Sequence, residues 1–205
     1  MKNTLLLLAL LVTAAACGKK KEEKAACCKP GQQKNKMFPA AVSDQSVYQL
    51  DGDWKNQDDQ SLKLASFAGK PVLMTMIYTH CGYACPLMVS DLKKIEALFT
   101  DAEREQFHIV LVSFDPDRDS PARLKSYAAS QRLGENWTLL QGTHDQAKEL
   151  SVVLQISFER LSDGSIDHAN SKILLNEKGE IVYRLEGLAT EPGLVAEQIR
   201  TLLKK

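Results

Sequence analysis

The hydrophobic positions of the chain predict strands and helices that alternate along most of its length. Two nearly continuous apolar runs, Pro71–Tyr78 and Phe107–Phe114, are typical of strands that are covered on both faces. Apolar residues recur at helical spacing in Pro86–Phe99. Ser120 can cap a helix that begins at Pro121 and runs to about Leu133. Further helices are expected over Asp145–Leu154 and Pro192–Leu203.

Shorter elements complete this order. Val47–Leu50 and Ser61–Leu64 have the composition of two short strands, separated by the polar stretch Asp51–Gln60. Lys172–Asn176 and Glu180–Leu185 flank a glycine-containing turn, which predicts a hairpin. Strand–helix–strand succession implies a parallel core, and the hairpin adds an antiparallel edge. The expected fold is α/β and thioredoxin-like: a mixed central sheet flanked by helices, with an N-terminal strand pair and an inserted hairpin.

The N-terminal residues have the pattern of a secretory signal. Leu5–Ala16 is an apolar run of 12 residues behind Lys2, and spanning a bilayer as a helix takes about 20. Small residues lead directly to Cys17, which resembles a bacterial lipobox, although Ala14 stands where Leu or Val is usual. The resemblance implies cleavage before Cys17, acylation of that cysteine and an extracytoplasmic lipoprotein of the bacterial cell envelope. An ordinary secretory peptide is the alternative.

Composition and charge divide the 205 residues into three segments. Residues 1–16 form the expected signal peptide of lipoprotein type. Residues 17–36 have almost no large apolar side chain and are expected to be a lipid-anchored disordered tether with a net charge of +5. Residues 37–205 are expected to form the folded domain, with a net charge of −6. The basic tether suits an anionic membrane surface or a plain solvated spacer, and the balanced total argues against nucleic acid as a partner.

Two cysteines stand where the first buried strand turns into a helix. Ligand sites in such sheets gather at the carboxyl ends of the strands, and Cys81 and Cys85 follow Tyr78 at that place. A helix N-terminus favours the thiolate, which is the form that binds metals and attacks disulfides. The spacing is one residue wider than the Cys-x-x-Cys of thioredoxin and allows both sulfurs to face one metal ion. A structural disulfide or two buried thiols is the alternative.

A histidine is the most suitable third ligand for such a pair. His168 lies in the polar segment Asp163–Asn170 just before the predicted hairpin and is the histidine that is most free to reach the strand ends. The other histidines have structural explanations: His80 points away from Cys81 in an extended segment, His108 lies in a buried strand, and His144 lies at a helix start. Two thiolates and one imidazole favour Cu(I), Cu(II) or Zn²⁺ over Ca²⁺ or Mg²⁺.

Three ordered motifs resemble the SCO/SenC family, whose members are copper-binding, thioredoxin-like factors for the assembly of cytochrome c oxidase. The motifs are Tyr78–Pro86, Val112–Pro121 and the dipeptide Asp167-His168. The resemblance implies that Cys81, Cys85 and His168 bind copper, as Cu(I) or Cu(II). It also implies a disulfide between Cys81 and Cys85 when they are oxidised, and a supporting position for Asp115 beside the ligands. Gly82 and Tyr83 depart from the family, which usually has Pro and often Asp there.

These residues predict a metallochaperone rather than an enzyme. Its expected partners are the copper-site subunit of a respiratory oxidase, other copper carriers or thiol–disulfide proteins, and a membrane that is reached through the lipid anchor. A thiol–disulfide oxidoreductase that keeps copper-site cysteines reduced is the alternative. A peroxidase on the same fold is disfavoured because nothing marks a peroxidatic cysteine and its arginine. For Cys27 and Cys28 in the tether, the alternatives are capture of copper for the main site, thiol exchange with the main pair, acylation or an intermolecular disulfide, or no role.

Overall fold

The computed structural model describes residues 46–188 and 190–204. The predicted signal peptide (1–16) and the predicted tether (17–36), with Cys17, Cys27 and Cys28, lie outside the described residues, as does the start of the predicted folded domain at residue 37. Within the described ranges, no helix combines the length and the apolar character that crossing a bilayer demands.

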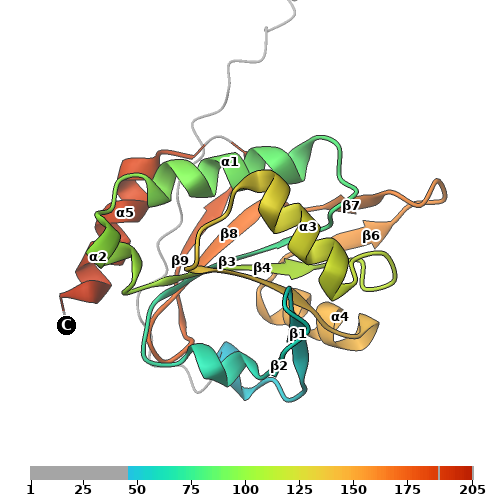
Figure 1. The fold of residues 1–205 in the computed structure, drawn as a ribbon, viewed down its shortest axis with the longest axis horizontal. Helices are drawn as coiled ribbons and strands as arrows, with labels where there is room; N and C mark the ends of the chain where they lie inside the picture. Colours follow the sequence, from blue (N-terminus) through green and yellow to red (C-terminus); the bar gives the residue numbers. More distant parts are fainter. Residues whose placement is uncertain (1–45, 189, 205) are drawn as a thin grey trace, which may run out of the picture. The chain divides into compact units, whose positions relative to one another are not determined.

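A mixed sheet of seven strands forms the centre of the fold, in the order β2-β1-β5-β4-β3-β8-β9 (Figure 1). The three inner strands β5, β4 and β3 run parallel, and the strands outside them are antiparallel to their neighbours. The bounds are β1 Trp54–Asn56, β2 Ser61–Leu62, β3 Val72–Ile77, β4 His108–Ser113, β5 Trp137–Gln141, β8 Ser171–Leu175 and β9 Ile181–Glu186. This is the mixed α/β sheet that the sequence predicted.

Helices cover both faces of this sheet. Figure 1 shows α1, α3 and α5 over one face and α4 on the other. The two consecutive crossovers β3-α1-β4 and β4-α3-β5 step in the same direction along the sheet, so right-handed connections place α1 and α3 on the same face. The bounds are α1 Ala84–Glu96, α2 Asp101–Arg104, α3 Pro121–Gln131, α4 His144–Val153 and α5 Pro192–Leu203, with 3-10 turns η1 Val47–Gln49 and η2 Leu64–Phe67.

The predictions that rest on long apolar runs and capping signals are confirmed. Every residue of β3 is buried, and so is every residue of β4 after His108. Helix α3 begins at Pro121, and the Ser120 hydroxyl accepts the backbone N–H of Arg123. Residues of both strands pack into one apolar core with the inner faces of the helices. These elements were predictable because each depends on a local pattern.

One strand of the N-terminal pair differs from the prediction, whereas the other, β2, forms at Ser61–Leu62 within the predicted segment Ser61–Leu64. Val47–Gln49 is a 3-10 turn rather than a strand, because the Ser46 hydroxyl accepts the backbone N–H of Tyr48 and caps the turn. The strand β1 lies instead in the stretch Asp51–Gln60, which was expected to be a polar connection. Trp54 and Asn56 face inward there while Lys55 is exposed. β1 lies between β2 and β5, antiparallel to both, and one of its faces packs on the core while the other is exposed, which accounts for this alternation.

The polar segment that carries His168 contains a strand, which was not predicted. β6 (Phe158–Arg160) and β7 (Ile166–His168) form a two-stranded sheet of their own, in which Phe158 lies opposite His168. The parallel strand β5 was not predicted from the sequence either. In both places the strands are short, and no local sequence pattern marks them. They form because they pair with neighbouring strands.

A buried ion pair ties helix α1 to the strand that follows His168. The Lys172 Nζ lies 3.3 Å from Asp91 Oδ2 and donates a hydrogen bond to the Gly187 carbonyl oxygen at 2.9 Å. Both charged side chains are buried. Removing one partner of such a pair is costly because the other charge stays desolvated. The pair therefore holds the helix that carries Cys85 in a fixed position relative to β8.

Candidate metal centre

The two cysteines lie at the junction of β3 and α1, as the motif predicted. The backbone N–H of Cys81 donates to the Tyr78 carbonyl oxygen at 3.2 Å, which closes a turn directly after the strand. Cys85 is the second residue of α1, and its backbone N–H donates to the Cys81 sulfur at 3.3 Å. Both thiols are free, with Cys85 buried and Cys81 partly exposed. The first turn of the helix thus supplies a hydrogen bond to the more accessible sulfur.

His168 completes a group of three potential ligands. Its Nε2 lies 3.6 Å from the Cys85 sulfur, and the ligand atoms of Cys81, Cys85 and His168 all lie within 4.8 Å of one another. The Nδ1 of His168 lies 3.2 Å from the Ala169 carbonyl oxygen. A donor at Nδ1 leaves Nε2 as the free lone pair, directed at the thiols. The structure therefore brings together the three residues that were predicted as ligands.

Aromatic side chains enclose the imidazole. The Tyr78 ring meets the His168 ring edge-on at a centroid distance of 6.0 Å, and the Phe114 ring lies 5.0 Å away. Phe114 also packs against Phe158, which is opposite His168 in the hairpin. Burial lowers the pKa of His168, although the Ala169 carbonyl oxygen opposes this effect. The imidazole is consequently held neutral near pH 7, the form that binds a metal.

The two thiols differ electrostatically. Burial alone would raise the pKa of Cys81, but hydrogen bonds from the backbone N–H groups of Cys85 and Tyr83 and from neighbouring side chains lower it below its usual value. Burial raises the pKa of Cys85, and the charges of Cys81 and Asp119 raise it further. Cys81 is therefore the more readily ionised of the two thiols, while Cys85 keeps its proton at neutral pH in the metal-free protein.

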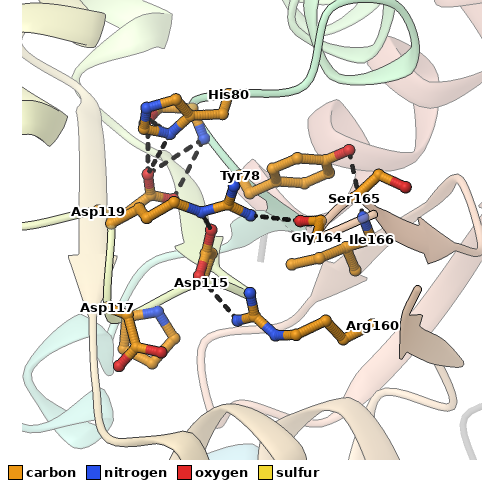
Figure 2. A network of polar contacts seen from close by, with 12 residues as sticks. Tyr78, His80, Asp115, Asp117, Asp119, Arg160, Gly164, Ser165 and Ile166 are labelled. Atoms are coloured by element: carbon orange, nitrogen blue, oxygen red, sulfur yellow. Dashed lines mark hydrogen bonds and ion pairs between the residues drawn. The ribbon is translucent and has the colours of Figure 1, made fainter. Parts of the chain in front are cut away.

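Asp115 supports the centre indirectly. Its buried carboxylate accepts hydrogen bonds from Arg118 and from Arg160, the latter at 2.8 Å. Arg160 belongs to β6, and Arg118 also donates to the Gly164 carbonyl oxygen in the hairpin turn at 2.7 Å. Figure 2 shows Arg160 directed at Asp115 from the hairpin. Asp115 is thus linked, through the two arginines, to the hairpin that carries His168.

Asp119 was not singled out from the sequence, and it organises the other half of the centre. Its buried carboxylate accepts hydrogen bonds from the Thr79 backbone N–H at 3.1 Å, the Thr79 hydroxyl at 2.5 Å and the Ser113 hydroxyl at 2.6 Å. Arg123 reinforces the same turn by donating to the Thr79 hydroxyl at 2.9 Å. The turn before Cys81 is therefore fixed from the β4–α3 connection (Figure 2). The sequence could have indicated Asp119, because this residue lies in the motif Val112–Pro121.

The remaining histidines contact other groups, as predicted. His80 lies 3.9 Å from the Asp119 carboxylate and remains exposed. His144 begins α4 and lies 2.9 Å from Asp117. The His108 ring packs edge-on against Phe67 at the start of β4. Among the described residues, the group of Cys81, Cys85 and His168 is the one that can hold a metal ion.

A sequence model of the SCO1/SenC family matches residues 43–204. The chain belongs to this family. It is 28% identical over 130 residues to a Stutzerimonas stutzeri protein that is named for copper binding, a match that covers 62% of this chain and 63% of that protein. It is 27% identical over 143 residues to the SCO1 protein homolog of Bacillus subtilis, which covers 68% of this chain and 74% of that protein.

Solved structures of SCO proteins share the fold. A SCO1/SenC family lipoprotein from Bacillus anthracis has a TM-score of 0.69 at 23% identity, covering 77% of this chain and 96% of that one. Copper-bound ScoI of Bradyrhizobium japonicum has a TM-score of 0.64 at 23% identity, covering 73% and 96%. BsSco, described as a member of the Sco family of cytochrome c oxidase assembly proteins, has a TM-score of 0.65 at 24% identity, covering 74% and 90%. The thioredoxin-like SCO fold is thereby established.

We expect the contribution of Asp115 to stability to depend on pH. Burial raises the pKa of this carboxyl group, but hydrogen bonds from Arg160 and Arg118 lower it below its ordinary value of 3.8. A lowered folded-state pKa means that the stabilisation is complete above that ordinary value and is lost as the pH falls through the folded-state value. Asp115→Asn should cost about 2 kcal/mol at pH 7, and urea unfolding of wild type and variant should show this cost shrinking below pH 4.

Asp117→Asn is the matched control, since Asp117 lies in the same connection but is exposed. Exposed ion pairs contribute little. The free energy of unfolding of this variant should therefore lie within about 0.5 kcal/mol of the wild-type value at pH 7 and at pH 3. A cost of Asp115→Asn that is equal at pH 7 and pH 3 would contradict the assignment of a buried carboxylate held by two arginines.

Proposed function

We propose that this protein binds copper through Cys81, Cys85 and His168 and delivers it to the copper site of a respiratory oxidase. The observation that carries the proposal is the convergence of two cysteine sulfurs and one imidazole nitrogen within 4.8 Å, in a chain of the SCO1/SenC family. The copper-bound structure of a similar protein supports copper as the metal. The description of another as a member of a family of cytochrome c oxidase assembly proteins supports an oxidase as the recipient. On this proposal the protein is a metallochaperone and has no turnover chemistry.

The donor set fits copper in both oxidation states. Thiolates are soft ligands that suit Cu(I), and an added imidazole suits Cu(II). Cys81 and Cys85 would hold Cu(I), and His168 would complete the coordination of Cu(II). The same donors suit Zn²⁺, so the selection of copper depends also on what the partners supply.

The unequal thiols suit transfer of the metal. Cys81 is partly exposed and belongs to a loop whose Tyr83 side chain is 74% exposed, whereas Cys85 is buried. A client can therefore replace the Cys81 sulfur first, while Cys85 and His168 still hold the ion. Tyr83 and Gly82, which depart from the usual family pattern, lie on the surface that an approaching client would meet.

The cell envelope is the proposed site of action. The apolar run Leu5–Ala16 and the lipobox-like residues before Cys17 support an acylated, membrane-anchored lipoprotein, and one structural neighbour is a SCO1/SenC family lipoprotein. Labelled palmitate should enter the wild-type protein in a bacterial host and should not enter Cys17→Ser. Wild type that remains unlabelled while it is exported would assign the segment to an ordinary signal peptide.

Copper titration of the full chain tests the metal site. Wild type should bind one Cu(II) with a sulfur-to-copper charge-transfer absorption band. His168→Ala should weaken Cu(II) binding by about 100-fold while changing Cu(I) binding much less, because the two thiolates remain. His144→Ala is the matched control, since that histidine is exposed and contacts Asp117. Binding that is indifferent to His168→Ala, or no one-to-one binding in wild type, would refute the proposal.

Thiol–disulfide exchange is the second candidate function. Cys81, with a lowered pKa and partial exposure, is arranged as the attacking thiolate, and the buried Cys85 is arranged as the resolving thiol. In this reaction Cys81 attacks the disulfide of a client, and Cys85 then displaces the client's remaining thiol. The client is reduced, while Cys81 and Cys85 are oxidised to a disulfide.

His168 discriminates between the two functions. Exchange needs only the two thiols. The rate at which the reduced protein reduces an oxidised oxidase fragment should therefore be within about twofold of the wild-type rate in His168→Ala. Cys81→Ser should abolish transfer. A rate that falls with His168→Ala as steeply as Cu(II) affinity does would remove exchange as an independent function.

A further inference from the structure

The strand β6 has one edge that pairs with no other strand, since β7 is its only partner in the described sheets. The Ala169 N–H donates to the Ser157 carbonyl oxygen at 2.9 Å, and the Leu161 N–H donates to the Ser165 carbonyl oxygen at 2.8 Å. Hydrogen-bonded positions alternate along an antiparallel pair. The backbone groups of Ser157, Glu159 and Leu161 therefore face β7, and those of the two residues between them face the free edge.

Phe158 and Arg160 are the two residues on this free edge. Their backbone N–H and C=O groups have no hydrogen-bond partner within residues 46–188 and 190–204. Each residue thus offers one donor and one acceptor. An unpaired strand edge is a template for another extended chain. The hairpin therefore presents a short row of backbone groups that one further strand would satisfy.

A largely apolar hollow of about 610 Å³ lies where α4 ends and β6 begins. Val152, Ile156 and Phe158 supply its apolar lining, and Lys148 is among its polar groups. Val152 is 69% exposed, so covering its side chain would be favourable. The strand β6 lies on the side of the hairpin that faces α4 (Figure 1). An extended chain laid along this edge would place a side chain over the hollow.

The outer face of the hairpin carries a negative charge that no cation balances. Glu159 and Asp167 lie directly opposite each other, and both are exposed. Neither forms an ion pair with a described residue. Like charges directly opposite each other destabilise a strand pair. A basic side chain opposite Glu159 on an added strand would relieve this repulsion.

The same charges disfavour a second copy of this chain at the edge. In the symmetric antiparallel pairing of two β6 strands, Glu159 would lie opposite Glu159 of the other copy. This contact would add to the repulsion that already exists between Glu159 and Asp167. The edge is therefore complementary to a basic segment of a different protein rather than to itself.

The free edge lies close to the metal centre because β6 is the strand beside His168. Phe158 lies directly opposite His168, and neighbouring strands are about 4.8 Å apart. A chain added to β6 would run about 10 Å from the strand that carries His168. Backbone pairing there displaces none of the three ligands, because the edge faces away from β7.

We propose that the free edge of β6 binds an extended segment of the copper-receiving partner as an added strand. The segment pairs through its backbone with Phe158 and Arg160, carries a basic side chain opposite Glu159 and places an apolar side chain over the hollow beside Val152. The inference rests on the proposed function and adds to it the mode of docking. The added strand holds the partner beside the centre while copper changes ligands.

Amide hydrogen exchange followed by NMR tests the backbone pairing. The probe is the soluble, metal-free copper-site fragment of a respiratory oxidase. The Phe158 and Arg160 amides should exchange rapidly in the free protein, and a saturating amount of the fragment should slow both by at least about tenfold. Unchanged exchange at these amides, or no association with the fragment, would overturn the inference. Slowing that grows with protein concentration without the fragment would assign the edge to a second copy and would also overturn it.

Two substitutions of exposed residues test the side-chain contacts. Val152→Lys places a charge at the apolar hollow, and Glu159→Lys reverses the charge that a basic side chain would meet. Each should raise the dissociation constant of the fragment about tenfold, and added salt should shrink the effect of Glu159→Lys. Leu98→Lys and Glu197→Lys are the matched controls, since both residues are exposed and lie outside the hairpin and α4. Equal effects in the test and control variants would contradict the assignment.

Copper titration of the same proteins separates this inference from the proposed function. Val152→Lys should bind copper with wild-type affinity but transfer it more slowly at low fragment concentration. If wild type binds no copper while the fragment still protects the Phe158 and Arg160 amides, the proposed function fails and the docking edge stands. If wild type binds and transfers copper and Val152→Lys transfers it at the wild-type rate, the inference alone fails.

Discussion

The buried carboxylate of Asp115 and its two arginines are the interaction on which the three-ligand centre depends. The hairpin of β6 and β7 is a sheet of its own and does not pair with the central sheet. A two-stranded hairpin is marginally stable by itself, so its position is set by what anchors it. Arg160 from β6 and Arg118, which also reaches the hairpin turn, meet on Asp115. His168 stands near Cys85 because this anchor, together with the packing of Phe114 against Phe158, holds the hairpin in place.

A single connection, between β4 and α3, therefore serves both halves of the centre. Asp115 faces the hairpin with His168, and Asp119 faces the turn that precedes Cys81. Both aspartates lie at the carboxyl end of a parallel strand, next to the end of β3, where ligand sites form in sheets of this kind. Buried carboxylates are tolerated there because each accepts several hydrogen bonds, which offset the cost of desolvation.

The same geometry makes the two thiols chemically different. The helix N-terminus and its N–H groups stabilise negative charge on Cys81, whereas burial and the nearby charge of Asp119 oppose it on Cys85. One sulfur is thus available to partners, and the other is protected behind it. This asymmetry serves metal transfer and disulfide exchange equally well, and His168 is the residue that distinguishes them.

The sequence by itself determined the buried strands, the helices with clear caps and the three ligands, because these depend on local patterns. Apolar runs identify β3 and β4, a serine and a proline identify the start of α3, and the spacing of Cys81 and Cys85 identifies the metal-binding turn. The family resemblance supported the choice of His168, added Asp115 and agrees with the match to the SCO1/SenC family.

Only the tertiary structure decided the rest, since it depends on pairings between distant residues. The strands β1 and β5 exist because they complete the sheet, and the segment of His168 is a strand because β6 lies beside it. The role of Asp119 follows from the groups that it faces across the core. Side chains are brought face to face by packing, and packing cannot be read from the spacing of residues along one chain.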